Sequence, residues 1–261
     1  MPWWAKLLTI MAPSRRTDLE VIERGSGDQL VVFVHGVLDG GQSFGRVAAL
    51  LEGECRMVWY DRRGYGRSLR APGVPVGVDV HVEDLLRVID ERRAVVVGHS
   101  FGGVTVVGAA LQAPELVGAV VLYETGMAWA PGWDDSHMRE VLWSEDPAKA
   151  GVQMMFRERF DAMAADQREI RLLEGRAFVA EERSVRTGTP PFDLSALQVP
   201  LVYGCSNRTD WSAVPRYLAE VAGAEIVELP GAGHNAHRTQ PGPFADLVRR
   251  GMALAAARGE R

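Results

Sequence analysis

Apolar residues fall into short continuous runs along this chain, separated by charged or glycine-rich segments. Five runs have the length and the branched apolar content of strands buried on both faces: residues 30–34, 56–60, 95–97, 117–123 and 199–203. Alternating apolar and charged positions at 18–24 predict a half-exposed strand, and 225–229 predicts another strand. Helical spacing predicts helices over 43–51, 78–92, 212–222 and 240–257. Strands that alternate with helices predict an α/β fold, with a mostly parallel sheet flanked by helices.

The pattern changes after residue 125, where no β-rich run occurs for about seventy residues. Three segments there predict helices: 134–143, 147–163 and 167–185. The chain is therefore expected to contain a core domain, residues 1–125 and 196–261, and a helical cap inserted at 126–195. The aromatic and methionine side chains of this insertion fit either its own core or an apolar acyl pocket.

The run at 95–97 stops at Gly98-His99-Ser100-Phe101-Gly102, a serine between glycines in the pattern G-x-S-x-G. Small neighbours allow a tight turn from a strand into a helix, which exposes the serine hydroxyl as a nucleophile. The same five residues also fit a glycine-rich turn with an incidental serine. The remainder of the chain has to decide between the two interpretations.

Composition and charge narrow the class of partner. The 261 residues are 47% hydrophobic and 24% charged, with a net charge of -5, so nothing attracts nucleic acid or an anionic membrane. Cys55 and Cys205 lack metal-ligand spacing and are expected to be free thiols without a disulfide. The apolar N-terminus lacks a basic leader and is too short to span a bilayer, so a cytoplasmic protein is expected. Trp3 and Trp4 either pack on the domain or touch a membrane or partner surface.

A serine nucleophile needs a base, and His234 supplies one in the late glycine-rich loop 230–237. Four motifs now occur in order along the chain: 34–36, 60–68, 98–102 and 231–234. With the order serine, acid, histidine, the chain resembles the α/β-hydrolase fold family. The resemblance implies that family's fold, with a helical cap inserted after the sixth strand.

The resemblance also implies roles for individual residues. Ser100 would be the nucleophile and His234 the general base and then acid, and the backbone nitrogens of Val37 and Phe101 would form the oxyanion hole. The other histidines nearby are assigned lesser roles. His35 and His99 are interpreted as structural or pocket-lining, and His237 is a second candidate base. The loop 61–68 and its surroundings carry four arginines, at positions 62, 63, 67 and 70, which are interpreted as solvated with local ion pairs in preference to an anion site.

The acid departs from the family pattern. Relatives commonly carry G-x-x-D after the strand that here ends at Gly204, but this chain has Asn207 at the matching position. An asparagine can fix the tautomer of a histidine without compensating its positive charge. Glu124, at the end of the preceding strand, is the favoured substitute, and Asp210 is the alternative. Glu124 also fits a strand-end carboxylate held by backbone N–H groups.

These residues predict a serine hydrolase that cleaves a small, mostly apolar ester-type substrate through an acyl-enzyme intermediate. Thioester, lactone and C–C bond hydrolysis would use the same groups. A protein of this fold that binds a small ligand without catalysis is the alternative, motivated by Asn207. The sequence contains no metal-ligand cluster or phosphate-binding loop, so no cofactor and no metal are expected, and it gives no indication of the oligomeric state.

Overall fold

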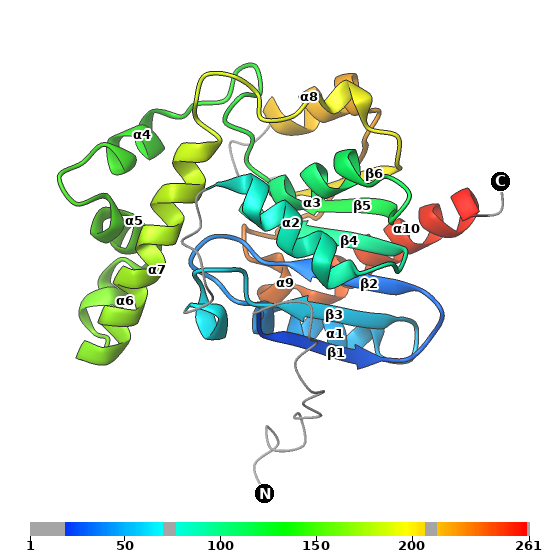
Figure 1. Ribbon diagram of the computed structural model, residues 1–261, viewed down its shortest axis with the longest axis horizontal. Coiled ribbons are helices and arrows are strands. Elements are labelled where there is room, and N and C mark those ends of the chain that lie inside the picture. The colour runs from blue at the N-terminus through cyan, green and yellow to red at the C-terminus, as the bar shows by residue number, and fades with distance from the viewer. Residues whose placement is uncertain (1–18, 70–76, 207–212, 260–261) are drawn as a thin grey trace, which may run out of the picture.

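The computed structural model of the protein describes residues 19–69, 77–206 and 213–259. Over these residues one seven-stranded sheet has the order β1-β3-β2-β4-β5-β6-β7 (Figure 1). The strands are β1 (Val21–Gly25), β2 (Leu30–Val34), β3 (Arg56–Tyr60), β4 (Ala94–His99), β5 (Val117–Tyr123), β6 (Leu201–Cys205) and β7 (Glu225–Glu228). All pair in parallel except β1, which is antiparallel to β3. The predicted α/β fold with a mostly parallel sheet is confirmed.

Helices cover both faces of this sheet. On one face lie α2 (Val78–Ile89), α3 (Phe101–Gln112) and α8 (Ala213–Ala222), and on the other lie α1 (Gly45–Leu51), α9 (Ala236–Thr239) and α10 (Pro241–Gly259). Short 3-10 turns η2 (Gly41–Phe44), η3 (Gly66–Ser68) and η4 (Leu194–Ala196) lie in the connections. Successive residues of β2 enter opposite cores, Val32 with α2 and α3, and Phe33 with α1 and α10. This two-sided burial explains the continuous apolar runs.

Four helices lie between β5 and β6: α4 (Ser136–Leu142), α5 (Pro147–Phe156), α6 (Glu158–Asp161) and α7 (Ala165–Ser184). We call them the helical insertion, and Figure 1 shows them gathered to one side of the sheet. In the described part of the chain they follow the fifth strand, so the expected position after the sixth strand is wrong. The resemblance implied one strand more than this part of the chain contains before the insertion. The helix expected at 147–163 is also broken, at Arg157, whose φ of 50° interrupts the helix.

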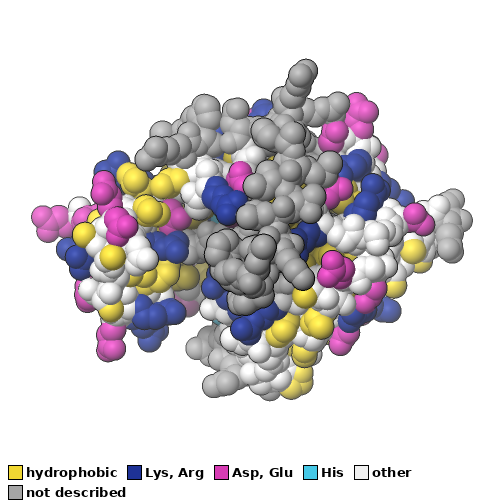
Figure 2. Space-filling view, turned by 90° about the horizontal axis from the view of Figure 1, so that it is seen from below, with side chains coloured by type: hydrophobic (Ala, Val, Ile, Leu, Met, Phe, Trp, Pro, Cys, Tyr) yellow, Lys and Arg dark blue, Asp and Glu magenta, His cyan; other side chains and the backbone are white. Residues whose placement is uncertain are grey.

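Several residues of the sequence analysis lie outside the described part of the chain: Trp3, Trp4, Asn207 and Asp210. Among the described helices none has the length and apolar character needed to cross a membrane. Figure 2 shows acidic, basic and apolar side chains interspersed over one face. Exposed apolar residues of the insertion include Trp143, Ile170 and Leu173.

Candidate active site

The register of the sheet brings four strand ends to one level. Val34 of β2 pairs with Gly98 of β4, His99 pairs with Tyr123 of β5, and Tyr123 pairs with Gly204 of β6. The segments that follow these strands therefore begin side by side at the carboxyl edge of the sheet. This edge is where parallel α/β sheets place their functional loops.

Ser100 occupies a sharp turn between β4 and α3. Its backbone has φ 52° and ψ −127°, a conformation that residues with a side chain rarely adopt. The turn closes because its neighbours lack side chains. A Cβ on Gly98 would lie 2.4 Å from Cα of Gly103, and a Cβ on Gly102 would lie 2.2 Å from the carbonyl oxygen of Val34. The glycines are thus required by contact, which favours the nucleophile interpretation of G-x-S-x-G.

Residues His35, Gly36, Val37 and Leu38, which we call the 35–38 loop, lie against this turn. A Cβ on Gly36 would lie 2.9 Å from Cβ of Ser100, so the loop backbone directly contacts the serine. Leu38 has a positive φ of 51°, which shows that packing and not local preference holds the loop. Val37, the next residue of the loop, is buried.

His35 holds the loop from within. Its Nε2 accepts a hydrogen bond from the backbone N–H of Arg62 at 2.8 Å, so its proton lies on Nδ1 and is donated to the Gly36 carbonyl at 2.7 Å. Burial, followed by the charge of Arg62, lowers the pKa of His35 to about 4. His35 is therefore a neutral structural residue at pH 7, as predicted.

Phe101 is the first residue of α3, directly after Ser100. The first N–H groups of a helix have no partner within the helix and carry the positive end of its dipole. The N–H of Phe101 thus belongs to a region suited to negative charge beside the serine. The structure places Val37 and Phe101 on the two segments that flank Ser100.

His234 and Glu124 approach each other from two loops. Nδ1 of His234 lies 3.5 Å from Oε2 of Glu124. The Glu124 side chain is fully buried, whereas that of His234 is 28% exposed. Oε1 of Glu124 accepts the backbone N–H of Ser206 at 2.8 Å, and Glu124 itself has a positive φ of 46°. One oxygen of Glu124 is thus held by backbone and the other faces the imidazole, a geometry that fits both interpretations of this residue.

Two side chains anchor the backbone around His234. The His99 Nε2–H donates to the carbonyl oxygen of His234 at 2.7 Å, and the Tyr123 hydroxyl donates to the carbonyl oxygen of Gly233 at 2.9 Å. Burial, followed by the charges of His237 and His234, lowers the pKa of His99 well below its usual value, so its ring is neutral. His99 therefore positions residues 230–237, which we call the 234 loop, in line with the structural role predicted for His99.

His237 is fully buried behind His99, and the two ring centroids are 4.3 Å apart. Its Nε2 lies 3.5 Å from Oδ2 of Asp39, which also pairs with Arg238. Burial opposes ionisation of Asp39, but the contact with His237 and the nearby histidines and Arg238 hold the pKa of Asp39 below its usual range. This burial makes His237 a poorer candidate base than His234, which is partly exposed.

Among the described residues, one group of side chains has the composition of a metal site, and it consists of the three residues just named. Asp39, His99 and His237 offer ligand atoms within 4.8 Å of one another. Arg238 already supplies a positive charge to Asp39, and the Asp39 contacts tie the 234 loop to the segment after β2. The group is accounted for as a structural link between the two loops.

The arginine-rich loop corrects an expectation. Arg62 and Arg63 are buried, and each binds a buried carboxylate with two nitrogens: Arg62 binds Glu181, and Arg63 binds Asp84. Among the arginines of this loop that the structure describes, the prediction of a solvated side chain holds for Arg67, which is exposed, and Arg70 lies outside the described residues. The carboxylate partners lie more than twenty residues away along the chain, so no local sequence pattern indicates that these cations are paired.

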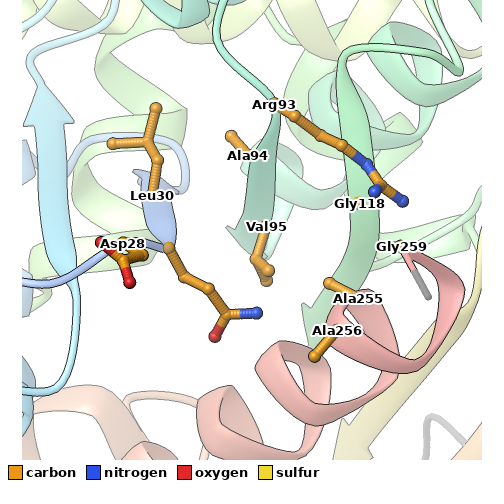
Figure 3. A pocket seen from close by; sticks show the side chains of 10 residues that line it. Asp28, Leu30, Arg93, Ala94, Val95, Gly118, Ala255, Ala256 and Gly259 are labelled. Atoms are coloured by element: carbon orange, nitrogen blue, oxygen red, sulfur yellow. The ribbon is translucent and has the colours of Figure 1, made fainter.

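A hollow of about 400 Å³ lies at the opposite edge of the sheet (Figure 3). Leu30, Ala94 and Gly118 line it at the amino ends of their strands, and Ala255 of α10 closes it. Since Ser100 and His234 lie at the carboxyl edge, this hollow is separate from the candidate active site.

The candidate site now combines a half-buried serine at a strand-to-helix turn, a partly exposed histidine and a buried carboxylate. A sequence model described as the alpha/beta hydrolase family matches residues 31–247. The chain is 36% identical over 129 residues to lipase LipV of Mycobacterium tuberculosis, a match that covers 48% of this chain and 47% of the lipase. It thus spans about half the length of the curated relatives it matches first.

Longer matches are weaker in sequence. The chain is 28% identical over 249 residues to 2-succinyl-6-hydroxy-2,4-cyclohexadiene-1-carboxylate synthase of Yersinia enterocolitica, with 84% of each chain covered. A thermophilic esterase from Thermogutta terrifontis shares the fold with a TM-score of 0.70 at 20% identity, over 92% of this chain and 97% of the esterase. Because the family model spans most of the sequence, the chain belongs to the alpha/beta hydrolase family.

Proposed function

We propose that the protein is a serine hydrolase that cleaves small, mostly apolar ester-type substrates through an acyl-enzyme intermediate. The observation that carries the proposal is the 3.5 Å approach of Glu124 Oε2 to Nδ1 of His234, at the edge of the sheet where Ser100 is held in a strained turn. A buried carboxylate at Nδ1 fixes the proton there, which makes Nε2 the nitrogen that acts as a base.

The reaction follows the order set by these groups. His234 takes the proton of the Ser100 hydroxyl as its oxygen attacks the ester carbonyl carbon, and Glu124 compensates the imidazolium charge that forms. The N–H groups of Val37 and Phe101 stabilise the oxyanion, each contributing about 3 kcal/mol in comparable hydrolases. His234 then protonates the leaving alcohol, and water repeats the sequence on the acyl-enzyme. Ser100 ends free and the acid is released.

Two observations favour an apolar ester as the substrate. Met127, Trp129 and Trp133 follow Glu124 within ten residues and pack against the core on the side of the insertion. Relatives of the chain are named a lipase and an esterase. We assign the acyl pocket to this apolar segment and treat residues 126–195 as a cap domain over a core formed by 1–125 and 196–261.

A fluorophosphonate probe tests the proposal because it labels only an activated serine. The wild type is expected to be labelled and to hydrolyse p-nitrophenyl butyrate, whereas Ser100→Ala should lose both properties with its thermal unfolding temperature unchanged. Equal labelling of the two proteins would remove Ser100 as the nucleophile. Absence of labelling and turnover in the wild type, with retained binding of small apolar ligands, would favour the non-catalytic alternative.

A further inference from the structure

The guanidinium of Arg62 is fully buried at the start of the loop after β3, and it binds the 35–38 loop. Its Nε donates to the carbonyl oxygen of His35 at 2.9 Å, and Nη2 donates to the carbonyl oxygen of Gly36 at 3.1 Å. With the backbone N–H bond to the His35 ring, three hydrogen bonds from one residue fix the two residues before Val37. The direction of the Val37 N–H therefore depends on where Arg62 lies.

Arg62 is itself held by the helical insertion. Glu181 of α7 accepts from Nη1 at 2.7 Å and from Nη2 at 3.2 Å. Tyr65 donates its hydroxyl proton to Oε2 of Glu181 at 2.8 Å, and Nε2 of His81 lies 2.6 Å from Oε1. Burial opposes its ionisation, but Arg62 and His81 lower the pKa of Glu181 to about 2, so the carboxylate is charged at neutral pH.

A fork-to-fork pair of this kind fixes direction as well as distance. Without the carboxylate, the buried guanidinium would have to find another acceptor, and its bonds to the His35 and Gly36 carbonyls would change with it. The 35–38 loop does not hold its conformation by local preference, because Leu38 has a positive φ that only its surroundings maintain. The contacts thus form one chain from α7 through Arg62 to the backbone beside Ser100.

We propose that Glu181 is a positioning residue for the oxyanion hole, acting through Arg62, so that the helical insertion is part of the catalytic machinery as well as a cover. The inference rests on the proposed function, since it concerns where the Val37 N–H points during ester hydrolysis. It assigns to one carboxylate of the insertion a role in the rate of the chemical step and none in substrate binding.

The test compares Glu181→Gln with Glu182→Gln. Glu182 is the next residue of α7, is also buried, and pairs with Arg186 inside the insertion, so it is a matched control. Glu181→Gln is expected to lower kcat for p-nitrophenyl butyrate about 10- to 100-fold, part of the effect of losing one oxyanion donor, with KM within about threefold. Glu182→Gln should change kcat by less than about threefold.

Amide hydrogen exchange measured by mass spectrometry gives a second readout that needs no catalysis. The peptide that contains the 35–38 loop should exchange faster in Glu181→Gln than in Glu182→Gln or in the wild type. Should Glu181→Gln fail to fold, Tyr65→Phe removes one hydrogen bond from the same carboxylate and is expected to change kcat and exchange in the same direction, by about two- to fivefold in kcat.

Three results would overturn the inference: equal kcat for the two glutamine variants, a rise in KM that accounts for the loss of kcat/KM, or unchanged exchange of the 35–38 peptide in Glu181→Gln. If Ser100→Ala retains wild-type turnover, the proposed function fails instead. The exchange comparison then still decides whether Glu181 holds the loop.

Discussion

Replacing Glu124 by glutamine should remove most of the activity while leaving the fold intact. The substitution keeps the shape of the side chain. The Ser206 N–H needs an acceptor, so the carbonyl oxygen of the new glutamine takes the place of Oε1. The amide NH2 then faces Nδ1 of His234. A donor in that place favours the tautomer with its proton on Nε2, which is unable to accept the proton of Ser100.

The electrostatic loss can be worked from the distance. With an effective dielectric constant of about 20, unit charges 3.5 Å apart attract by about 5 kcal/mol. This attraction arises only when His234 is protonated in the transition state, so its loss raises the barrier directly. An increase of about 1.4 kcal/mol in the activation free energy slows the reaction tenfold, so the loss of this attraction should lower kcat by roughly a thousandfold or more.

The measurement is the steady-state hydrolysis of p-nitrophenyl butyrate by wild type, Glu124→Gln and Asp210→Asn, with thermal unfolding followed for each. Asp210 is the alternative acid from the sequence, and its variant should keep kcat within about threefold. A Glu124→Gln enzyme that retains kcat within about tenfold would refute the assignment of Glu124, and a large loss in Asp210→Asn would transfer the role.

Other expectations concern the surroundings of the site. Gly36→Ala places a methyl group 2.9 Å from Cβ of Ser100, so kcat should fall more than tenfold or so and the unfolding temperature should drop, and an unchanged kcat would contradict the close contact. The free energy of unfolding should decrease as the pH is lowered from about 6.5 to 4, because the pKa of His35 is about 4 in the folded protein and the unfolded chain therefore binds the proton first. Urea unfolding should show a loss of up to about 3 kcal/mol over this range, and the loss should be smaller in His35→Gln. Arg62→Ala should destabilise by about 3–5 kcal/mol, whereas Arg67→Ala on the surface should stay within about 0.5 kcal/mol, and similar values for both would show that burial of the pair is unimportant.

The strands and the order of the site segments were predictable because each depends on local pattern. The run at 95–97 ends at Gly98 and Ser100, and the structure turns there, since the glycine spacing already encodes the turn. The number of strands before the insertion was wrong because it came from the resemblance and not from counting the apolar runs of this chain.

The acid and the buried arginines show two different limits. Glu124 was a candidate because it ends a strand, but its distance from His234 depends on a loop 110 positions later in the chain. Arg62 was interpreted as solvated because its partner Glu181 is equally remote, and a charged residue carries no local sign of burial. Tertiary packing decides which of these side chains meet, and neither the hydrophobic pattern nor the sequence motifs contain that information.

Leu38, Ser100 and Glu124 all have positive φ angles, and they lie in the segments that follow the adjacent strands β2, β4 and β5. Each such conformation costs about 1–3 kcal/mol relative to a relaxed residue, and glycine would relieve much of it. Selection for thermal stability alone would therefore favour glycine at Ser100, whose side chain is small, whereas glycine at Leu38 or Glu124 would also remove a buried side chain and its contacts. Thermostable variants of this protein should be screened for turnover at the same time, because the substitutions that are easiest to gain lie where activity would be lost.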